Sequence, residues 1–116
     1  MFGLATKVIG VSADESEATL RTLVGDLIKE MAGRLGTRPE AIGATEIDVD
    51  DSQVGAGYGI PTPASTEALE LVARREGILL DPVYTAKAMA GLIARIRRGA
   101  FTKDDTILFW HTGGLH

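Results

Sequence analysis

The feature that most constrains the fold is a periodic row of apolar side chains in the first third of the chain. The row repeats at spacings of three and four residues, which is the period of one face of an α-helix. Its members are Leu20, Leu23, Val24, Leu27, Ile28, Met31 and Leu35, and Gly36 follows as a left-handed stop. We therefore predict a long helix that ends at Gly36 and buries this face against another layer.

A short apolar run in front of this helix is predicted to be a buried strand. It extends from Lys7 to Val11 and is rich in β-branched residues. Ser12 and Glu15 have the spacing of a capping box, which would start the helix directly after the strand.

Predicted strands and helices also alternate along the rest of the chain, and this order indicates the fold class. Helices are predicted from Ser65 to Glu76 and from Thr85 to Arg98, a strand at Glu46 to Val49, and a final strand over the apolar run Thr106 to Trp110. Because a helix with one apolar face needs a sheet to cover, the pattern predicts an α/β fold. We expect a three-layer domain with a mostly parallel sheet covered by helices, in a single segment over residues 1–116.

Size and composition exclude several classes of protein. With 116 residues the chain suits one domain, and its formal charge of −4, with scattered basic residues, argues against a nucleic-acid partner. No apolar run approaches the ~18 residues of a membrane helix. The chain has no cysteine for thiolate chemistry. The start of the sequence lacks the pattern of a signal peptide, so we expect a cytoplasmic protein.

Two turns place hydroxyl side chains next to apolar segments. Asp81 and the proline after it open the third helix beside Tyr84 and Thr85, and the last apolar run ends in Thr112 and Gly113. In α/β proteins ligands bind at the carboxyl ends of strands. The two turns therefore predict part of a cofactor site.

Four segments carry a resemblance to a known family. They are Gly57-Tyr58-Gly59-Ile60-Pro61, Glu76-Gly77-Ile78, Asp81-Pro82-Val83-Tyr84-Thr85-Ala86-Lys87-Ala88-Met89 and His111-Thr112-Gly113-Gly114. With these segments the chain resembles the C-terminal part of the D-cysteine desulfhydrase and 1-aminocyclopropane-1-carboxylate deaminase family, which are pyridoxal-phosphate enzymes of fold type II. The resemblance implies that the chain is the C-terminal part of the family's large domain. In the family, the Schiff-base lysine and the phosphate-binding glycine loop lie upstream of this region.

The resemblance also implies which residues contact the cofactor, pyridoxal 5'-phosphate in the complete enzyme. Thr112, followed by Gly113, is expected to offer a neutral hydroxyl to the ring nitrogen. In the deaminase branch a glutamate follows the tyrosine of the Pro-Val-Tyr segment, whereas this chain has Thr85 there. Thr85 is therefore expected beside the cofactor and favours the desulfhydrase branch. A role as helix N-cap is an alternative for Thr85, and the two roles are compatible.

Tyr84 and Tyr58 are expected on the substrate side of the cofactor as catalytic residues. A phenol can transfer a proton or orient a carboxylate, and a neighbouring cation that lowers its pKa would make it a base or a nucleophile. The alternative for each is an amphipathic plug at a loop–helix junction. The resemblance favours function for Tyr84 and leaves Tyr58 open.

Lys87 and the two histidines are interpreted as structural. Lys87 lies just inside a helix and does not match the upstream lysine of the family. His111 and His116 have no further ligand at a suitable spacing, so no metal site is predicted. We expect His111 to lie at a strand end with a ring nitrogen bonded to the backbone.

An acidic run offers a different hypothesis. Carboxylates after a strand, here Glu46, Asp48, Asp50 and Asp51, can hold Mg²⁺ and accept a phosphoryl group in small signalling domains. The preferred interpretation is a solvated strand edge with Ile47 and Val49 turned inward.

Taken together, we expect the C-terminal portion of a pyridoxal-phosphate-dependent lyase or deaminase that acts on a small amino acid. The reaction expected from the resemblance converts D-cysteine to pyruvate, sulfide and ammonia, and the isolated chain is expected to be inactive. The alternatives are 1-aminocyclopropane-1-carboxylate deaminase and a non-catalytic α/β binding or regulatory module. Expected partners are the amino-acid substrate and either a second copy of the chain or the missing N-terminal portion, but no nucleic acid or membrane.

Overall fold

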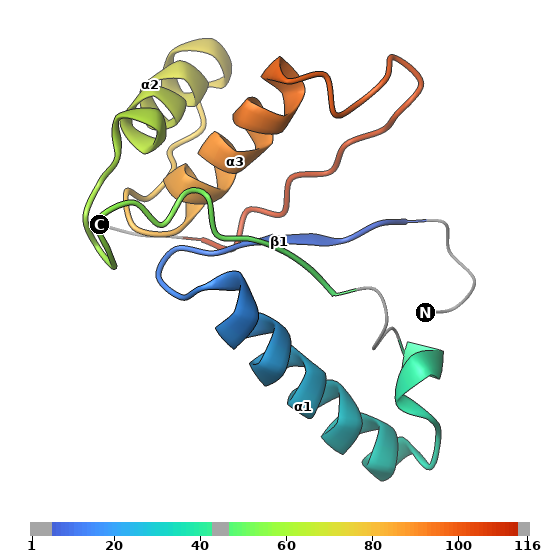
Figure 1. The fold of residues 1–116 in the computed structure, drawn as a ribbon. Helices are drawn as coiled ribbons and strands as arrows, with labels where there is room; N and C mark the ends of the chain where they lie inside the picture. The colour runs from blue at the N-terminus through green and yellow to red at the C-terminus, as the bar shows by residue number, and fades with distance from the viewer. Residues whose placement is uncertain (1–5, 43–46, 114–116) are drawn as a thin grey trace.

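A computed structural model of the protein describes residues 6–42 and 47–113. Its elements are, in chain order, β1 (Ile9–Val11), α1 (Glu17–Leu35), the 3-10 helix η1 (Pro39–Ile42), β2 (Asp48–Asp50), α2 (Pro63–Glu76) and α3 (Thr85–Arg97). Helix α1 lies on one side of strand β1, and α2 and α3 lie on the other (Figure 1). The predicted α/β architecture of helices on both faces of a sheet is confirmed.

The sheet consists of β1 and β2, which pair in parallel as predicted. Ile9 lies opposite Asp48, and Val11 lies opposite Asp50. Helix α3 packs against β1 at Gly91, where an added Cβ would lie 3.1 Å from a methyl group of Val11. Because the strands are parallel, the loops after them leave the sheet at the same edge.

Helix α1 begins later than the sequence predicts. The Ser12 hydroxyl accepts a hydrogen bond from the backbone N–H of Glu15 (3.0 Å) and donates one to the carbonyl of Glu15 (2.7 Å). These bonds build a turn between strand and helix. The N-cap is Ser16, whose hydroxyl accepts from the N–H of Thr19 (3.2 Å). The prediction of a capping box at Ser12 is wrong because the same spacing also suits a local turn, and the chain needs that turn to reverse direction.

The described residues of the acidic run after η1 form ion pairs and hydrogen bonds with neighbouring elements. Asp48 pairs with Lys7 (2.8 Å). Asp50 pairs with Arg95 of α3 (3.0 Å), and both of these side chains are largely buried. Val49 between them is buried, as predicted. The interpretation as a solvated strand face is therefore wrong for Asp50, because a cation on the covering helix compensates its charge.

Asp51 serves the start of α1. Its carboxylate accepts the backbone N–H of Glu17 (2.8 Å), the kind of bond that stabilises a helix N-terminus.

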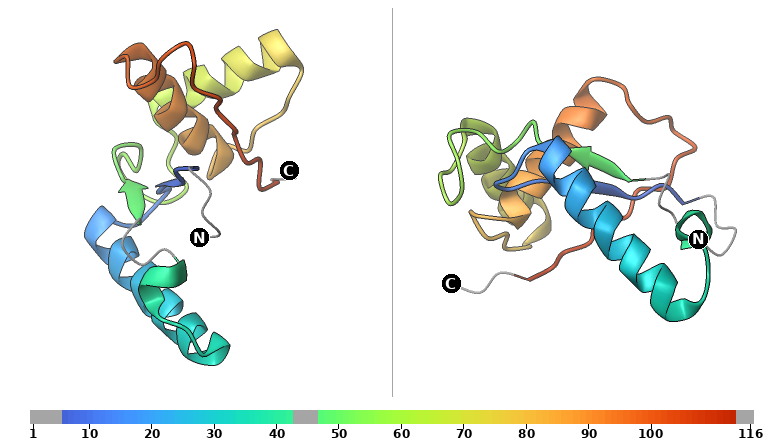
Figure 2. Two further views of the ribbon diagram at one scale, coloured as in Figure 1. Left: turned by 90° about the vertical axis from the view of Figure 1, so that its right-hand side faces the viewer. Right: turned by 60° about the horizontal axis from the view of Figure 1, so that its bottom comes forward.

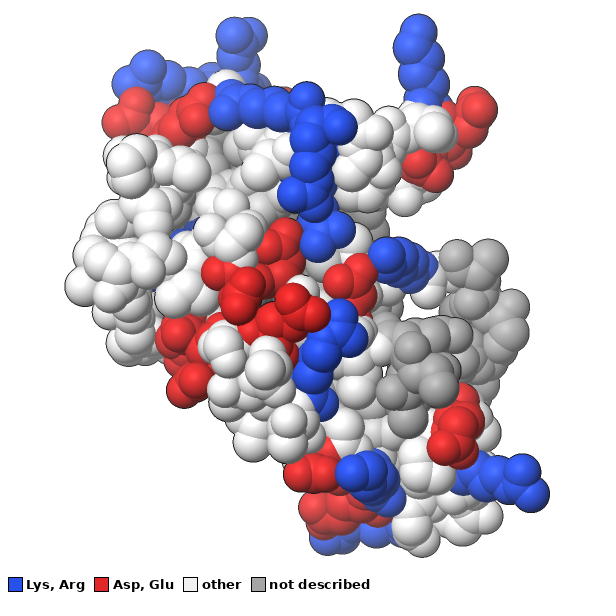
Figure 3. Space-filling model, viewed as in Figure 1, with Lys and Arg blue, Asp and Glu red and all other residues white. Residues whose placement is uncertain are grey.

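Acidic side chains gather at the middle of the face in Figure 3, with basic side chains around them. Within residues 6–42 and 47–113, no group of three or more histidine, aspartate or glutamate side chains is arranged to hold a metal ion. Glu46 lies outside the described residues.

Helices α2 and α3 match the predicted positions closely. Helix α2 starts at Pro63, two residues early, because Thr62 and Ser65 form the reciprocal bonds of a capping box. Gly77 ends it in the left-handed conformation. Among the described residues, no helix has the length and apolar composition that a bilayer span needs.

The predicted strand from Thr106 to Trp110 does not form. The segment runs without a regular backbone partner in the described part of the chain, and Phe109 packs on the small core formed by α2, α3 and Leu80. A strand requires a neighbour to pair with, and its apolar composition alone does not supply one.

The apolar face of α1 is open in this chain. Leu23, Leu27, Met31 and Leu35 are exposed, Leu27 to 65%, and Ala32 is the buried residue of the helix. Figure 2 shows α1 extending away from the layer of α2 and α3. The radius of gyration, 15.7 Å, exceeds the roughly 13 Å of a compact domain of this length. The prediction that this face is buried does not hold within the chain itself.

We propose that the open face of α1 drives self-association of the isolated chain, since large apolar patches rarely remain in water. Leu27→Lys places a charge in the middle of the face and should weaken association at least tenfold, because burying one leucine contributes about 1.5–3 kcal/mol. Sedimentation velocity at several concentrations measures the effect.

The control is Thr22→Lys, which adds the same charge to the opposite side of α1. It should associate like the wild type. A wild-type chain that stays monomeric over the whole concentration range would contradict the proposal.

Candidate functional site

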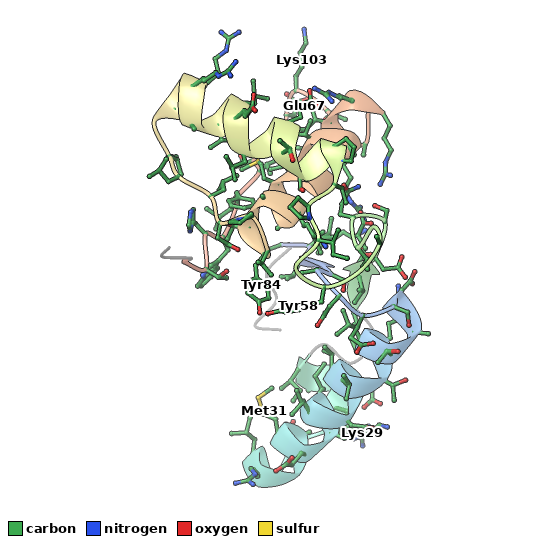
Figure 4. The ribbon with its side chains drawn as sticks, turned by 90° about the vertical axis from the view of Figure 1, so that its left-hand side faces the viewer. Lys29, Met31, Tyr58, Glu67, Tyr84 and Lys103 are labelled. Carbon is green, nitrogen blue, oxygen red and sulfur yellow. The ribbon has the colours of Figure 1, made fainter. Side chains whose placement is uncertain are left out.

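Two tyrosines meet at the edge of the sheet where both strands end. Tyr58 lies in the loop after β2, and Tyr84 is the residue before α3. Their side chains point toward each other (Figure 4), their hydroxyls are hydrogen-bonded, and their ring centroids are 5.9 Å apart with the planes at 60°. Tyr58 is 58% exposed and Tyr84 is 51% exposed. The pair therefore presents two linked hydroxyls at the surface rather than two buried plugs.

The pairing raises the pKa of Tyr84. The hydrogen bond with Tyr58 raises the pKa of Tyr84 above its ordinary value of 10.0, and slight desolvation and the charges of Asp14 and Asp81 act in the same direction. A cation that lowers this pKa, the condition under which Tyr84 would act as a nucleophile, is not among these causes. Tyr84 is thus a phenol that keeps its proton at neutral pH and can donate it.

Lys87 fixes the loop that carries Tyr58. Its side chain is in the first turn of α3 and is completely buried. The ammonium donates to the carbonyl oxygens of Ala13 (3.1 Å), Val54 (2.8 Å) and Gly57 (2.9 Å). Ala13 belongs to the turn after β1, and the other two belong to the loop after β2. The structural interpretation of Lys87 is confirmed.

The other three lysines of the chain lie away from the tyrosine pair. Lys7, which precedes β1, pairs with Asp48 at the start of β2, and Lys29 pairs with Asp26 on α1. Lys29 and Lys103 lie at opposite ends of the molecule, with the tyrosines between them (Figure 4). All four lysines are within the described residues, and none presents a free ammonium to the tyrosine hydroxyls.

Glycines allow the loop after β2 to fold tightly. Gly55 and Gly57 have φ angles of 67° and 146°, which residues other than glycine rarely adopt. At Gly55 an added Cβ would lie 2.4 Å from the Thr62 side chain. The glycine-rich composition that marked this segment as a turn therefore serves to bring Tyr58 and the carbonyl of Gly57 to α3.

Asp81 organises the start of α3 and positions Tyr84. One carboxylate oxygen accepts the N–H groups of Val83 (2.9 Å) and Tyr84 (2.6 Å). The other accepts the N–H (2.9 Å) and the hydroxyl (2.6 Å) of Thr85. Burial acts to raise the pKa of Asp81, but the bonds from the Thr85 hydroxyl and from the three N–H groups outweigh it and lower the pKa from 3.8 to about 2.

Thr85 is the first residue of α3 and not its N-cap. It is buried, and its hydroxyl accepts from the N–H of Asp81 (2.8 Å) while donating to the Asp81 carboxylate. The alternative role of Thr85 as the N-cap is therefore wrong, because Tyr84 occupies that position and the Asp81 carboxylate accepts the N–H groups of this turn. The hydroxyl proton and one of its two lone pairs are therefore used within the protein.

Thr112 and Gly113 are exposed, and His111 ties their segment to the backbone of Leu79. Nδ1 of His111 accepts the N–H of Gly113 (3.1 Å), so Nε2 carries the proton and donates to the carbonyl of Leu79 (3.0 Å). The prediction that His111 bonds to the backbone is confirmed. The Thr112 hydroxyl makes no hydrogen bond with any described residue, and Gly113 has a φ of 104°. His116, the other half of the rejected metal pair, lies outside the described residues.

The structure joins some predicted site residues and not others. It brings Tyr58 and Tyr84 into contact, and the His111 bond ties the segment with Thr112 and Gly113 to the one before Asp81. An apolar hollow of about 490 Å³ between α2, α3 and the C-terminal segment contains neither tyrosine. Its lining is Leu71, Val72, Arg75, Glu76, Ile78, Leu80, Met89, Ile93, Phe109 and His111.

Two contributors to the site do not emerge from the sequence patterns above. Asp81 is placed there only as a turn residue, although an aspartate directly before a proline is a recognisable signal for a helix N-terminus. The carbonyls that bind Lys87 cannot be recognised in the sequence. Every residue has a carbonyl, and side-chain patterns do not show where it points.

Asp81→Asn should destabilise the chain and remove a pH dependence. The lowered pKa of Asp81 contributes about 2 kcal/mol above pH 3.8, which is lost as the pH falls toward 2. In the variant this loss is absent, since the amide does not titrate, and the free energy of unfolding at pH 7 falls by about 1–2 kcal/mol. Urea unfolding between pH 2 and 7 measures both effects. The exposed Asp104→Asn is the control and should keep the wild-type slope.

Tyr58→Phe should lower the pKa of Tyr84 toward 10.0, because it removes the hydrogen bond that is the largest cause of the raised value. The chain has two tyrosines, so the variant leaves one phenol to titrate. Absorbance at 295 nm against pH, or the ¹³Cζ chemical shift of labelled tyrosine, monitors it, and Tyr84→Phe assigns the signals in the wild type. A Tyr84 titration that is the same with and without the Tyr58 hydroxyl would show that the pair does not form.

Comparison with known proteins assigns this arrangement to a family. The family model described as "Pyridoxal-phosphate dependent enzyme" matches residues 2–113. D-cysteine desulfhydrases of Salmonella paratyphi C and Salmonella typhi are 44% identical over 108 residues, which cover 93% of this chain and 32% of theirs. A crystal structure of an ACC deaminase homologue matches with a TM-score of 0.69 and 32% identity, over 80% of this chain and 27% of that one.

These matches agree in fold and in family. The chain spans about a third of the length of the curated relatives that it matches. The family match covers the residues that form the tyrosine site, including both loops and helix α3. The chain belongs to the family of pyridoxal-phosphate dependent enzymes.

Proposed function

We propose that this chain is the C-terminal part of a pyridoxal-phosphate-dependent lyase that converts D-cysteine to pyruvate, sulfide and ammonia. The observation that carries the proposal is the hydroxyl pair of Tyr58 and Tyr84, held where the loops of two parallel strands meet the start of α3. Such an edge is where α/β proteins bind ligands. The similarity to D-cysteine desulfhydrases over 93% of the chain supports the choice of substrate.

In this proposal Thr112 lies at the nitrogen side of the pyridoxal ring. Thr112 has an exposed hydroxyl with no partner in the described part of the chain, and Gly113 beside it leaves room for a ring to approach. A neutral hydroxyl suits an unprotonated pyridine nitrogen, because it donates a hydrogen bond without stabilising a positive charge there. We leave Thr85 out of this contact, since its hydroxyl is buried and engaged by Asp81.

The tyrosine pair would handle a proton at the substrate. The cofactor, when bound, supplies the electron sink for breaking bonds at the α-carbon of an amino acid. Tyr84 keeps its proton at neutral pH, so it suits a donor to the departing thiolate of D-cysteine better than a base. Tyr58 orients the Tyr84 hydroxyl, and Asp81 fixes the backbone of Tyr84 through its N–H.

The same geometry supports the expectation that the isolated chain is inactive. The family holds its cofactor through a lysine, and none of the four lysines here offers a free ammonium beside the tyrosine pair. The apolar face of α1 is also exposed in this chain. This exposure is expected if another part of the complete enzyme normally covers the face. We propose that the complete enzyme supplies the lysine, the phosphate loop and that cover.

The second candidate is 1-aminocyclopropane-1-carboxylate deaminase, which the solved ACC deaminase homologue favours. Two features of this chain weigh against it. Position 85 holds a threonine where the deaminase pattern has a glutamate, and the raised pKa of Tyr84 disfavours a phenolate nucleophile.

A chimera tests the proposal directly. The D-cysteine desulfhydrase of Salmonella typhi, with its matching segment replaced by this chain, should release sulfide from D-cysteine. Tyr84→Phe in the chimera should lower kcat roughly 10²–10⁴-fold, the usual size of a general acid contribution, with a smaller effect on KM. Lys29→Ala, a change in an exposed ion pair on α1, is the matched control and should keep full activity.

Each outcome separates the candidates. Ammonia from 1-aminocyclopropane-1-carboxylate without sulfide from D-cysteine would identify a deaminase. A folded chimera that turns over neither substrate would favour a non-catalytic module. The isolated chain mixed with pyridoxal phosphate should release no sulfide, and turnover by it would contradict the proposed division of the site.

A further inference from the structure

Lys87 is a buried cation surrounded by neutral oxygens. Its side chain is 0% exposed, and the three N–H bonds of the ammonium match three acceptors, the carbonyls of Ala13, Val54 and Gly57. In the described part of the chain no carboxylate forms an ion pair with it. The carbonyl dipoles therefore provide the compensation for its charge.

Burying the Lys87 charge costs free energy, which indicates that the charge itself has a role. Removing an ammonium from water costs several kcal/mol, and a methionine would fill the same space without that cost. A ring of backbone carbonyls replaces the hydration shell of a monovalent cation, as in ion-selective pores. Divalent cations prefer carboxylates among their ligands, and this cage has none. Its chemistry thus suits a single positive charge.

The cage also sets the geometry of the tyrosine pair. Gly57 precedes Tyr58 in the chain, and Lys87 lies three residues after Tyr84 on α3. The bond between Lys87 and Gly57 therefore joins the two tyrosine-bearing segments close to the hydroxyl contact itself. Without the charge, three carbonyls would face one another unpaired and the loops would separate.

We propose that the carbonyl oxygens of Ala13, Val54 and Gly57 form a monovalent-cation site, which Lys87 fills with its own ammonium and thereby positions Tyr58 against Tyr84. Lys87 is a positioning residue, because it acts through the loop and not on a substrate. The proposal concerns how the loops are held, so it stands or falls independently of the proposed function.

Two variants of the full chain distinguish a cation site from ordinary packing. Lys87→Ala removes the stem and the ammonium and leaves space for an added cation. Lys87→Met keeps a stem of similar length, and its terminal methyl blocks that space. Contact between the tyrosines is monitored by nuclear Overhauser effects between their rings and by the titration of Tyr84.

In tetramethylammonium chloride, both variants should lose the ring contacts and titrate like Tyr58→Phe. In potassium chloride or n-propylammonium chloride of equal ionic strength, Lys87→Ala should regain the ring contacts and the wild-type titration. The n-propylammonium ion reproduces the atoms deleted by the substitution. Lys87→Met should not respond to either salt.

Two results would overturn the proposal. One is a Lys87→Met variant whose tyrosines behave as in the wild type, since the charge would then be unnecessary. The other is a Lys87→Ala variant with the same tyrosine contacts in all three salts. If Lys87→Ala is unfolded in tetramethylammonium chloride, refolding on addition of n-propylammonium or potassium supports the site, and failure to refold in either opposes it.

Discussion

Lys87 connects three parts of the chain that are far apart in sequence. Its ammonium reaches Ala13, 74 residues away, and Val54 and Gly57, 33 and 30 residues away. The two loops after the parallel strands are thereby fastened to one turn of α3. Because Tyr58 belongs to one of these loops and Tyr84 to the start of α3, the contact between the tyrosines depends on this buried charge.

Asp81 complements Lys87 from the other side of the same helix start. It satisfies N–H groups that the first turn of a helix leaves without partners, and it fixes the backbone at Tyr84. The carboxylate holds the turn before α3, and the ammonium holds the loops beside it. Hydrogen bonds thus tie the backbone on both sides of the tyrosine pair, while Tyr58 and Tyr84 remain exposed.

One apolar surface remains exposed in the described part of the chain. Two paired strands lie between α1 on one face and α2 and α3 on the other, and α1 leaves its apolar face uncovered. The chain spans about a third of the length of its curated relatives. An open apolar face and a half-built cofactor site have the same physical explanation in our proposal, which is that further protein packs on both.

Local patterns in the sequence indicated the helices, their glycine stops and the two tyrosine-bearing turns, because hydrophobic period, propensity and turn chemistry act over a few residues. The alternation of helices and strands along the whole chain indicated the parallel sheet. The tertiary structure alone decided that Tyr58 meets Tyr84, that Asp50 turns toward Arg95, and that Thr85 directs its hydroxyl to Asp81. It also decided that residues 106–110 pair with no strand in the described part of the chain and that the apolar face of α1 stays exposed. These outcomes depend on which segments become neighbours in space. The sequence of side chains shows neither where a backbone carbonyl points nor whether a segment finds a partner.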